Sequence, residues 1–184
     1  KRAVRFLCQH PRVVQRFEEQ EICTTMTIKA DSDWAGDRKS RKSTSGGALM
    51  IGKNLIKTWS KTQSLLALSS GESEFYAALK TSAEALGVLS ILKDFGVHLR
   101  GRVLGDASAA LGIINRKGLG RTRHIDTGLL WIQEVAASKR LEYGKVLGKI
   151  NPADLMTKYV IESKSEKCCT YLSSHRSSGR SGVG

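Results

Sequence analysis

The sequence predicts an α/β domain built on a mixed five-stranded sheet, with helices packed on its faces. Two features of the chain lead to this expectation. The first is a group of three strand-like segments joined by turn residues, and the second is a later alternation of helical and strand-like segments. The chain has 184 residues, of which 40% are hydrophobic, so it is long enough for one domain with a substantial core and too short for two large ones.

The three strand-like segments are expected to form an antiparallel meander. Residues 23–31 (CTTMTIKAD) are rich in β-branched residues and alternate apolar with polar side chains. Residues 46–52 (GGALMIG) and 55–61 (LIKTWSK) read as two further strands. The intervening residues 52–54, Gly-Lys-Asn, are typical of a tight turn, and they favour direct pairing of the two strands.

A long helix is predicted to follow, from about residue 70 to 95, with Gly96 closing it. Ser69 and Glu72 fit a capping box, in which Ser69 caps the helix and Glu72 reaches back to its start. Glu74 lies two positions further along, about 200° around the helix, so it cannot face the same site as Glu72. We therefore assign Glu72 a structural task and take Glu74 as the candidate ligand.

The second half of the chain alternates between strand and helix in the order that builds parallel sheets. A strand over 101–106 precedes a helix over 107–118, and a helix over 124–139 precedes a strand over 140–148. A last helix is predicted over 151–160, with Asn151 as its N-cap and Pro152 in its first turn. From residue 161 onward the chain loses periodicity and gathers Ser, Gly and basic residues, which predicts a disordered tail over 161–184.

The charge balance favours a polyanionic partner. Thirty Lys and Arg residues face 17 Asp and Glu residues, a formal net charge of +13. Such a surface suits nucleic acid or an anionic membrane surface. No run approaches the roughly 18 apolar residues that a membrane span requires, and the first residues lack the apolar core of a secretory signal. We therefore expect an intracellular protein without a membrane anchor.

Four acidic residues fall near element ends that a mixed sheet brings together: Asp31, Glu74, Asp106 and Asp154. Taken singly, each has a structural explanation, since Asp106 could cap a helix and Asp154 could interact with a helix dipole. Taken together, they offer the oxygen ligands that Mg²⁺ prefers. Two such ions, about 3.5–4 Å apart, can stabilise the attacking and the leaving oxygen of a phosphodiester displacement.

Two basic segments are candidates for phosphate binding. They contain Arg38, Lys39, Arg41, Lys42, Arg121 and Arg123. Either segment could instead be a solvated turn. His124 follows the second segment; a lone histidine is typical of a capping or packing residue, and the alternative is a neutral imidazole that transfers protons.

Five ordered blocks of the chain resemble the ribonuclease H region at the end of the polyprotein of copia-type retrotransposons. The blocks are DSDWAGDRKSRKSTSGG, TWSKTQSLLALSSGESEFYAAL, GDASAALGIINR, RTRHID and NPADLMTK. The resemblance covers residues 26–160. The lead-in over residues 1–25, read as a short helical segment, resembles the end of the preceding reverse transcriptase connection.

The resemblance implies a ribonuclease H-like fold and an endonuclease that cleaves the RNA strand of RNA:DNA hybrids during reverse transcription. It implies two Mg²⁺ or Mn²⁺ ions as cofactors, and it places the ligands of the family's acidic motifs on Asp31, Glu74, Asp106 and Asp154. The implied partners are an RNA:DNA hybrid and the reverse transcriptase region of the same polyprotein, with no membrane, in the cytoplasm and in virus-like particles.

Two alternatives remain at this point. One is an inactive module of the same fold that only binds hybrids, and retention of all four carboxylates argues against it. The other is a different nuclease or strand-transfer enzyme, since a fold does not determine the chemistry. The five-block resemblance and the lack of an HHCC zinc-binding segment argue against that second alternative.

Overall fold

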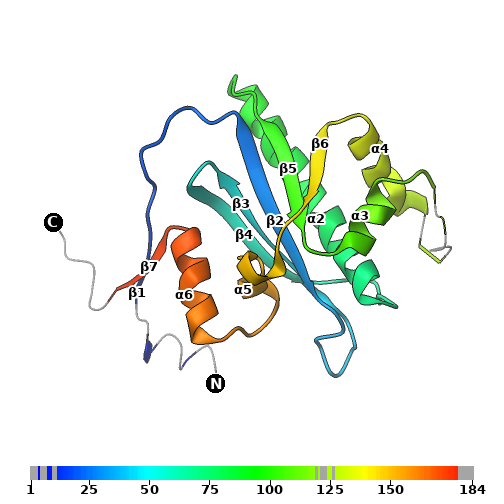
Figure 1. Cartoon of the computed structure of the whole chain (residues 1–184), viewed down its shortest axis with the longest axis horizontal. Helices are drawn as coiled ribbons and strands as arrows, with labels where there is room; N and C mark the ends of the chain where they lie inside the picture. Colours follow the sequence, from blue (N-terminus) through cyan, green and yellow to red (C-terminus); the bar gives the residue numbers. More distant parts are fainter. Residues whose placement is uncertain are drawn as a thin grey trace.

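The structure is a computed structural model, and it describes residues 12–118, 120, 124, 125 and 127–177, together with residues 4, 8 and 9. Its centre is a five-stranded sheet with the strand order β4-β3-β2-β5-β6 (Figure 1). The strands are β2 (Thr25–Asp33), β3 (Thr44–Ile51), β4 (Asn54–Thr62), β5 (Arg100–Gly105) and β6 (Leu141–Lys145). Strands β2, β3 and β4 are antiparallel, and β5 and β6 pair in parallel. The predicted mixed sheet is confirmed.

Helices cover both faces of this sheet. They are α2 (Ser70–Asp94), α3 (Ser108–Ile114), α4 (Trp131–Ala137), α5 (Asp154–Thr157) and α6 (Glu162–Tyr171), with 3-10 turns η1 (Thr127–Leu130) and η2 (Gly148–Ile150). Figure 1 shows α2 behind the sheet and α5 and α6 in front of it. The two faces follow from the alternation along β2, in which Met26 and Ile28 contact the α2 side while Lys29 and Asp31 face α6 and α5.

The core is divided by the sheet. Under α2, Met26, Ile28, Leu49 and Val103 pack with Ala85. By length and composition alone, α2 could cross a membrane. Its apolar side chains are instead used to pack against the sheet in the protein core. A second group between α2, α3 and α4 contains Phe75, Ala78, Ile113, Ile114 and Ile132.

The start of α2 confirms half of the predicted capping box. The backbone N–H of Glu72 donates to Ser69 Oγ at 3.2 Å, as expected for an N-cap. The Glu72 carboxylate, however, accepts from the backbone N–H of Leu68 at 2.9 Å and does not return to Ser69. Gly96 ends the helix with a positive φ of 75°, a conformation that glycine adopts readily.

Both ends of the chain differ from the expectation. Residues 12–15 form strand β1 (Arg12–Gln15), not a helical lead-in, and β1 pairs antiparallel with β7 (Ser174–Ser177). The expected disorder from residue 161 is wrong as far as residue 177, because α6 and β7 occupy this segment. Residues 178–184 lie outside the described residues.

Tertiary packing explains why the C-terminal segment folds. Leu172 is 3% exposed and packs against Ala48 and Met50 on the face of the sheet opposite α2. The ring of Tyr171 lies 3.7 Å from the ammonium of Lys29, a cation–π contact. Few apolar residues make these contacts, so the segment shows no periodicity in the sequence.

Candidate active site

Asp31 and Asp106 come together because their strands are parallel neighbours. In the register of β2 with β5, Lys29 lies opposite Leu104. Two residues further along the chain come Asp31, within β2, and Asp106, just past the end of β5, at the edge where the carboxyl ends of parallel strands meet. Asp31 is 1% exposed although its side chain is a carboxylate.

Glu74 completes this group from the first turns of α2. Ligand oxygens of Asp31, Glu74 and Asp106 all lie within 4.8 Å of one another. Glu74 Oε1 also accepts a hydrogen bond of 3.1 Å from the backbone N–H of Ser32, which fixes the carboxylate beside β2. Three of the four predicted acidic residues therefore form one cluster, which we call the acidic cluster.

The electrostatics of the acidic cluster suit a divalent cation. Burial raises the pKa of Glu74 to about 7, and the negative charges of Asp31 and Asp106 contribute to the rise. Burial also raises the pKa of Asp31 to about 6, against the opposing hydrogen bond from Thr157. Carboxylates placed this close disfavour one another's ionised form, and a bound Mg²⁺ or Mn²⁺ would remove that cost, so these residues fit the implied ion.

Asp154 has different neighbours. Its Oδ1 lies 2.9 Å from the Nζ of Lys158, and its Oδ2 accepts a hydrogen bond from Lys164 of α6. Burial alone raises the pKa of Asp154, but the interactions with the ammonium groups of Lys164 and Lys158 outweigh it and lower the pKa below its usual value. Lys158 also lies 3.3 Å from Asp31, so it bridges the two carboxylates. The structure thus places Asp154 next to the acidic cluster but pairs it with lysines.

Asn151 positions Asp154 relative to the sheet. The residue is fully buried, and its amide donates to the carbonyl of Ala30 at 2.8 Å. Its Oδ1 accepts from the backbone N–H of Ala153 at 3.2 Å. This double contact ties α5 to β2 one residue before Asp31. The predicted N-cap role of Asn151 is wrong, because α5 begins at Asp154 with Ala153 as its N-cap and no side-chain cap hydrogen bond.

Gly46 allows α5 to approach the sheet. It lies opposite Asp31 in the register of β2 and β3. A Cβ at this position would come within 2.6 Å of Thr157 Cγ2 and 2.7 Å of Met156 Cβ. The absent side chain at Gly46 is therefore needed for the observed packing of α5.

A buried polar network that the sequence does not reveal fixes the start of α2. Ser32 Oγ and Ser73 Oγ are 2.7 Å apart, and Gln63 Nε2 donates to Ser45 Oγ and to the carbonyl of Ser73, both at 2.9 Å. These contacts join β2, β3 and α2 beside Glu74. The seryl residues have no spacing that would distinguish them from ordinary loop residues in the sequence.

His124 does not belong to the acidic cluster. Its Nε2 lies 3.0 Å from Glu72 Oε2, and Tyr76 Oη donates to Glu72 Oε1 at 2.6 Å. Burial raises the pKa of Glu72, but the hydrogen bonds from Tyr76 and His124 outweigh it and lower the pKa overall. His124 thus has a structural partner, on the side of α2 that Glu72 faces.

The first predicted basic segment lies on the hairpin between β2 and β3. Arg38, Lys39 and Arg41 are exposed, and Lys42 is partly exposed. Asp37 shapes the turn by accepting hydrogen bonds from the Lys39 backbone N–H at 3.0 Å and the Ser40 hydroxyl at 2.5 Å. The first basic segment therefore follows β2, the strand that carries Asp31. Arg121 and Arg123 lie outside the described residues.

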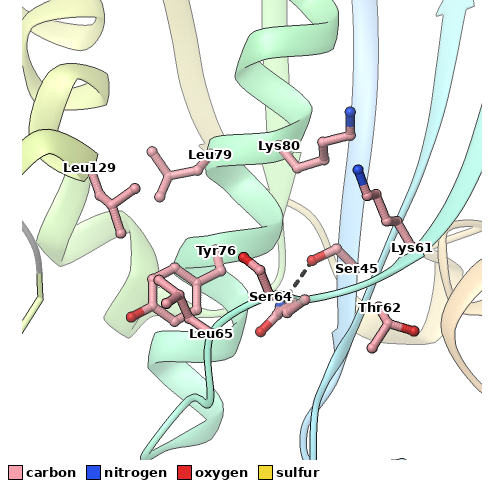
Figure 2. A pocket seen from close by; sticks show the side chains of 10 residues that line it. Ser45, Lys61, Thr62, Ser64, Leu65, Tyr76, Leu79, Lys80 and Leu129 are labelled. Carbon is pink, nitrogen blue, oxygen red and sulfur yellow. Dashed lines mark hydrogen bonds between the residues drawn. The ribbon is translucent and has the colours of Figure 1, made fainter.

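A separate cavity lies between the end of β4 and α2. Figure 2 shows Leu79 and Leu129 near one another, while Lys61 and Lys80 lie together at another part of the rim. Tyr76 also lines it. None of the four predicted acidic residues lines this cavity, so it is distinct from the acidic cluster.

The chain is similar in sequence to proteins encoded by plant transposons. The chain is 34% identical over 147 residues to the retrovirus-related Pol polyprotein from transposon TNT 1-94 of Nicotiana tabacum, covering 79% of the chain and 11% of that protein. It is 35% identical over 77 residues to the corresponding polyprotein from transposon RE1 of Arabidopsis thaliana, covering 41% of the chain and 5% of that protein. The chain thus spans about a tenth or less of the length of these relatives. No family model matches it.

Among solved structures, the chain is similar to LC11-RNase H1, isolated from compost by a metagenomic approach. The TM-score is 0.50 at 14% sequence identity, covering 73% of this chain and 93% of that one. The chain has a ribonuclease H-like fold. It is a homologue of a segment of the retrovirus-related Pol polyproteins of plant transposons, as the sequence blocks predict.

Proposed function

We propose that the chain is an endonuclease that cleaves the RNA strand of RNA:DNA hybrids during retrotransposon reverse transcription. The observation that carries this proposal is the gathering of Asp31, Glu74 and Asp106 from three separate elements at one edge of the sheet. The ribonuclease H-like fold and the homology to transposon Pol polyproteins support it.

In this proposal Asp31, Glu74 and Asp106 hold a divalent ion, Mg²⁺ or Mn²⁺. When bound, such an ion lowers the pKa of a water nucleophile and stabilises the developing charge on phosphate oxygens. The chain contributes preorganised ligands. Asp31 is held on a central strand, and Glu74 is oriented by the Ser32 backbone N–H and the serine network beneath it.

Substrate binding is assigned to the positive charge of the chain. We assign phosphate contacts to the exposed or partly exposed hairpin residues Arg38, Lys39, Arg41 and Lys42, and also to Arg121 and Arg123, which lie outside the described residues. Selection of the RNA strand would depend on 2′-hydroxyl contacts across the shallow minor groove, which is a readout of shape. The reverse transcriptase region of the same polyprotein is the proposed partner, in the cytoplasm and in virus-like particles. A proton-transfer role for His124 stays a prediction.

Incubation of the purified chain with a labelled RNA:DNA hybrid tests the proposal. We expect loss of the RNA strand with Mg²⁺, no loss with chelator, and no cleavage by Asp31→Asn or Asp106→Asn. Asp94→Asn, which changes an exposed carboxylate at the end of α2, is the matched control and should cleave normally.

Two other results would contradict the proposal. Tight hybrid binding without cleavage by the wild-type chain would identify a binding module. Equal cleavage of duplex DNA would indicate a different nuclease on the same fold.

A further inference from the structure

Two lysines lie beside the acidic cluster. The ammonium of Lys158 is 2.9 Å from Asp154 Oδ1 and 3.3 Å from the carboxylate of Asp31. Lys164 contacts the other oxygen of Asp154 and also donates to the carbonyl of Gly148 at 3.2 Å. Both oxygens of Asp154 therefore have an ammonium group nearby, Oδ2 through a hydrogen bond from Lys164 and Oδ1 through an ion pair with Lys158 that lacks hydrogen-bond geometry.

The carboxylates in these contacts are buried, while the lysine side chains are partly exposed, 40% for Lys158 and 27% for Lys164. Asp31 is 1% exposed and Asp154 is 2% exposed. Buried carboxylates are rarely left without a compensating cation, because removing them from water is costly. When all four carboxylates are ionised, they and the two ammonium groups together leave two net negative charges, which is the charge that one divalent ion neutralises.

The geometry of the ligands agrees with this charge balance. Within the described part of the chain, the residues whose ligand atoms lie within 4.8 Å of one another are Asp31, Glu74 and Asp106. Asp154 is not in that group, although α5 holds it next to Asp31. The residue that bridges Asp154 to Asp31 is Lys158, four positions after Asp154.

We propose that Lys158 and Lys164 take the place of a second divalent ion, so that the chain binds one ion through Asp31, Glu74 and Asp106. This inference rests on the proposed function only in taking the acidic cluster as the metal site. It replaces the two ions expected from the sequence with one ion and two fixed ammonium groups.

Helix α6 contributes to the site through Lys164. The helix is held by the packing of Leu172 and by the ion pair between Arg176 and Glu162. Lys164 projects from this helix to Asp154. The C-terminal segment therefore supplies a cation to Asp154, next to the acidic cluster.

The number of bound ions tests the inference directly. Mn²⁺ binding to the full 184-residue chain would be followed by electron paramagnetic resonance, alone and with a DNA strand paired to an uncleavable 2′-O-methyl RNA strand. We expect one ion per chain in both cases. Asp154→Asn should still bind one ion with affinity within about twofold of the wild type, whereas Asp106→Asn should weaken binding by about tenfold or more.

The double variant Lys158→Ala/Lys164→Ala should bind two ions, because it frees Asp154 and restores two negative charges. Lys167→Ala, an exposed lysine on the same helix, is the matched control and should bind one. Circular dichroism would show whether the double variant is folded; if it is not, the wild type and Asp154→Asn decide the question alone.

Two ions on the wild type, no ion on the wild type, or loss of the ion in Asp154→Asn would each overturn the inference. Cleavage of an unmodified RNA:DNA hybrid by the same protein preparations separates the inference from the proposed function. Cleavage with two ions bound would overturn this inference and leave the proposed function standing. One bound ion without cleavage would overturn the proposed function and leave this inference standing.

Discussion

Glu72 and Glu74 show how far single residues can be assigned from the sequence. The 200° separation on a helix assigns them to different sides, and the structure places Glu74 in the acidic cluster and Glu72 beside Tyr76 and His124. Asn151 was expected only to cap a helix. Its second contact, to the Ala30 carbonyl, depends on an approach between distant segments that no local pattern encodes.

The raised pKa values of Glu74 and Asp31 make the stability of the metal-free chain depend on pH. Glu74 has a reference pKa of 4.5 and a folded pKa of about 7, so between these values the folded state holds a proton that the unfolded state has released. Asp31 behaves in the same way between 3.8 and about 6. The free energy of unfolding therefore falls as pH rises through this window.

Thermal melts in chelator between about pH 5 and 8 would measure this effect. The melting temperature should fall by a few degrees as the pH rises. Glu74→Gln should flatten most of the fall, and Mn²⁺ should restore the wild type at the higher pH. A melting temperature that rises with pH in chelator would contradict the assigned cause.

Glu72 is expected to contribute to stability and not to ion binding. Glu72→Ala removes the acceptor for the Tyr76 hydroxyl and the Leu68 backbone N–H, and it leaves His124 without its carboxylate partner. We expect a loss of about 1–3 kcal/mol in the free energy of unfolding, measured by urea denaturation. Asp94→Ala, an exposed carboxylate on the same helix, should change it by less than about 0.5 kcal/mol. An unchanged stability in Glu72→Ala would show that water replaces the carboxylate.

At the level of elements, the long and regular segments were predictable and the short ones were not. Strand β2 alternates in polarity, a glycine turn joins β3 to β4, and α2 has a cap at both ends. Helix α5 has only four residues, and its position depends on Asn151 and Gly46. Such a short helix has little stability of its own, so tertiary contacts decide where it forms.

Gly46 is the position where the contact between elements is most sensitive. Gly46→Ala would place a methyl group within 2.7 Å of Thr157 and Met156, which forces α5 away from β3. We expect a loss of about 1–3 kcal/mol in stability and weaker contacts of Thr157 and Lys158 with Asp31.

Gly112 provides the control for this substitution. It lies within α3, and a Cβ there meets nothing within 4 Å. Gly112→Ala should therefore be neutral or stabilising by about 0.5–1 kcal/mol, because alanine favours helix. If both substitutions changed the free energy of unfolding equally in urea denaturation, Gly46 would not be required for the close approach of α5.

At the level of the whole molecule, the excess of positive charge could be read from the sequence, but its distribution could not. The net charge is +13, and two of the lysines, Lys158 and Lys164, pair with the buried carboxylate of Asp154. The exposed hairpin residues are available for an external polyanion. The sequence does not distinguish these two uses, because the first requires α5 and α6 to be in place.

The salt dependence of hybrid binding should show whether the exposed hairpin residues contact phosphates. Replacing Arg38, Lys39 and Arg41 together with alanine should weaken binding and reduce the slope of log K against log salt, by about 0.7–0.9 for each phosphate that the variant no longer neutralises. Fluorescence anisotropy with a labelled hybrid measures both quantities. Lys93→Ala, in the last turn of α2, is the control and should leave the slope unchanged. An unaltered slope in the triple variant would remove the hairpin from the binding surface.

The ribbon of β1 and β7 has a consequence for the order in which the chain folds. Its side-chain contact between Gln15 and Ser174 joins residues 159 positions apart, so it closes a very long loop for only four paired residues on each strand. Loop-closure entropy delays such a pairing until the central sheet has formed. The ribbon should therefore assemble last, and its amide hydrogens should exchange with solvent before those of β2 and β5.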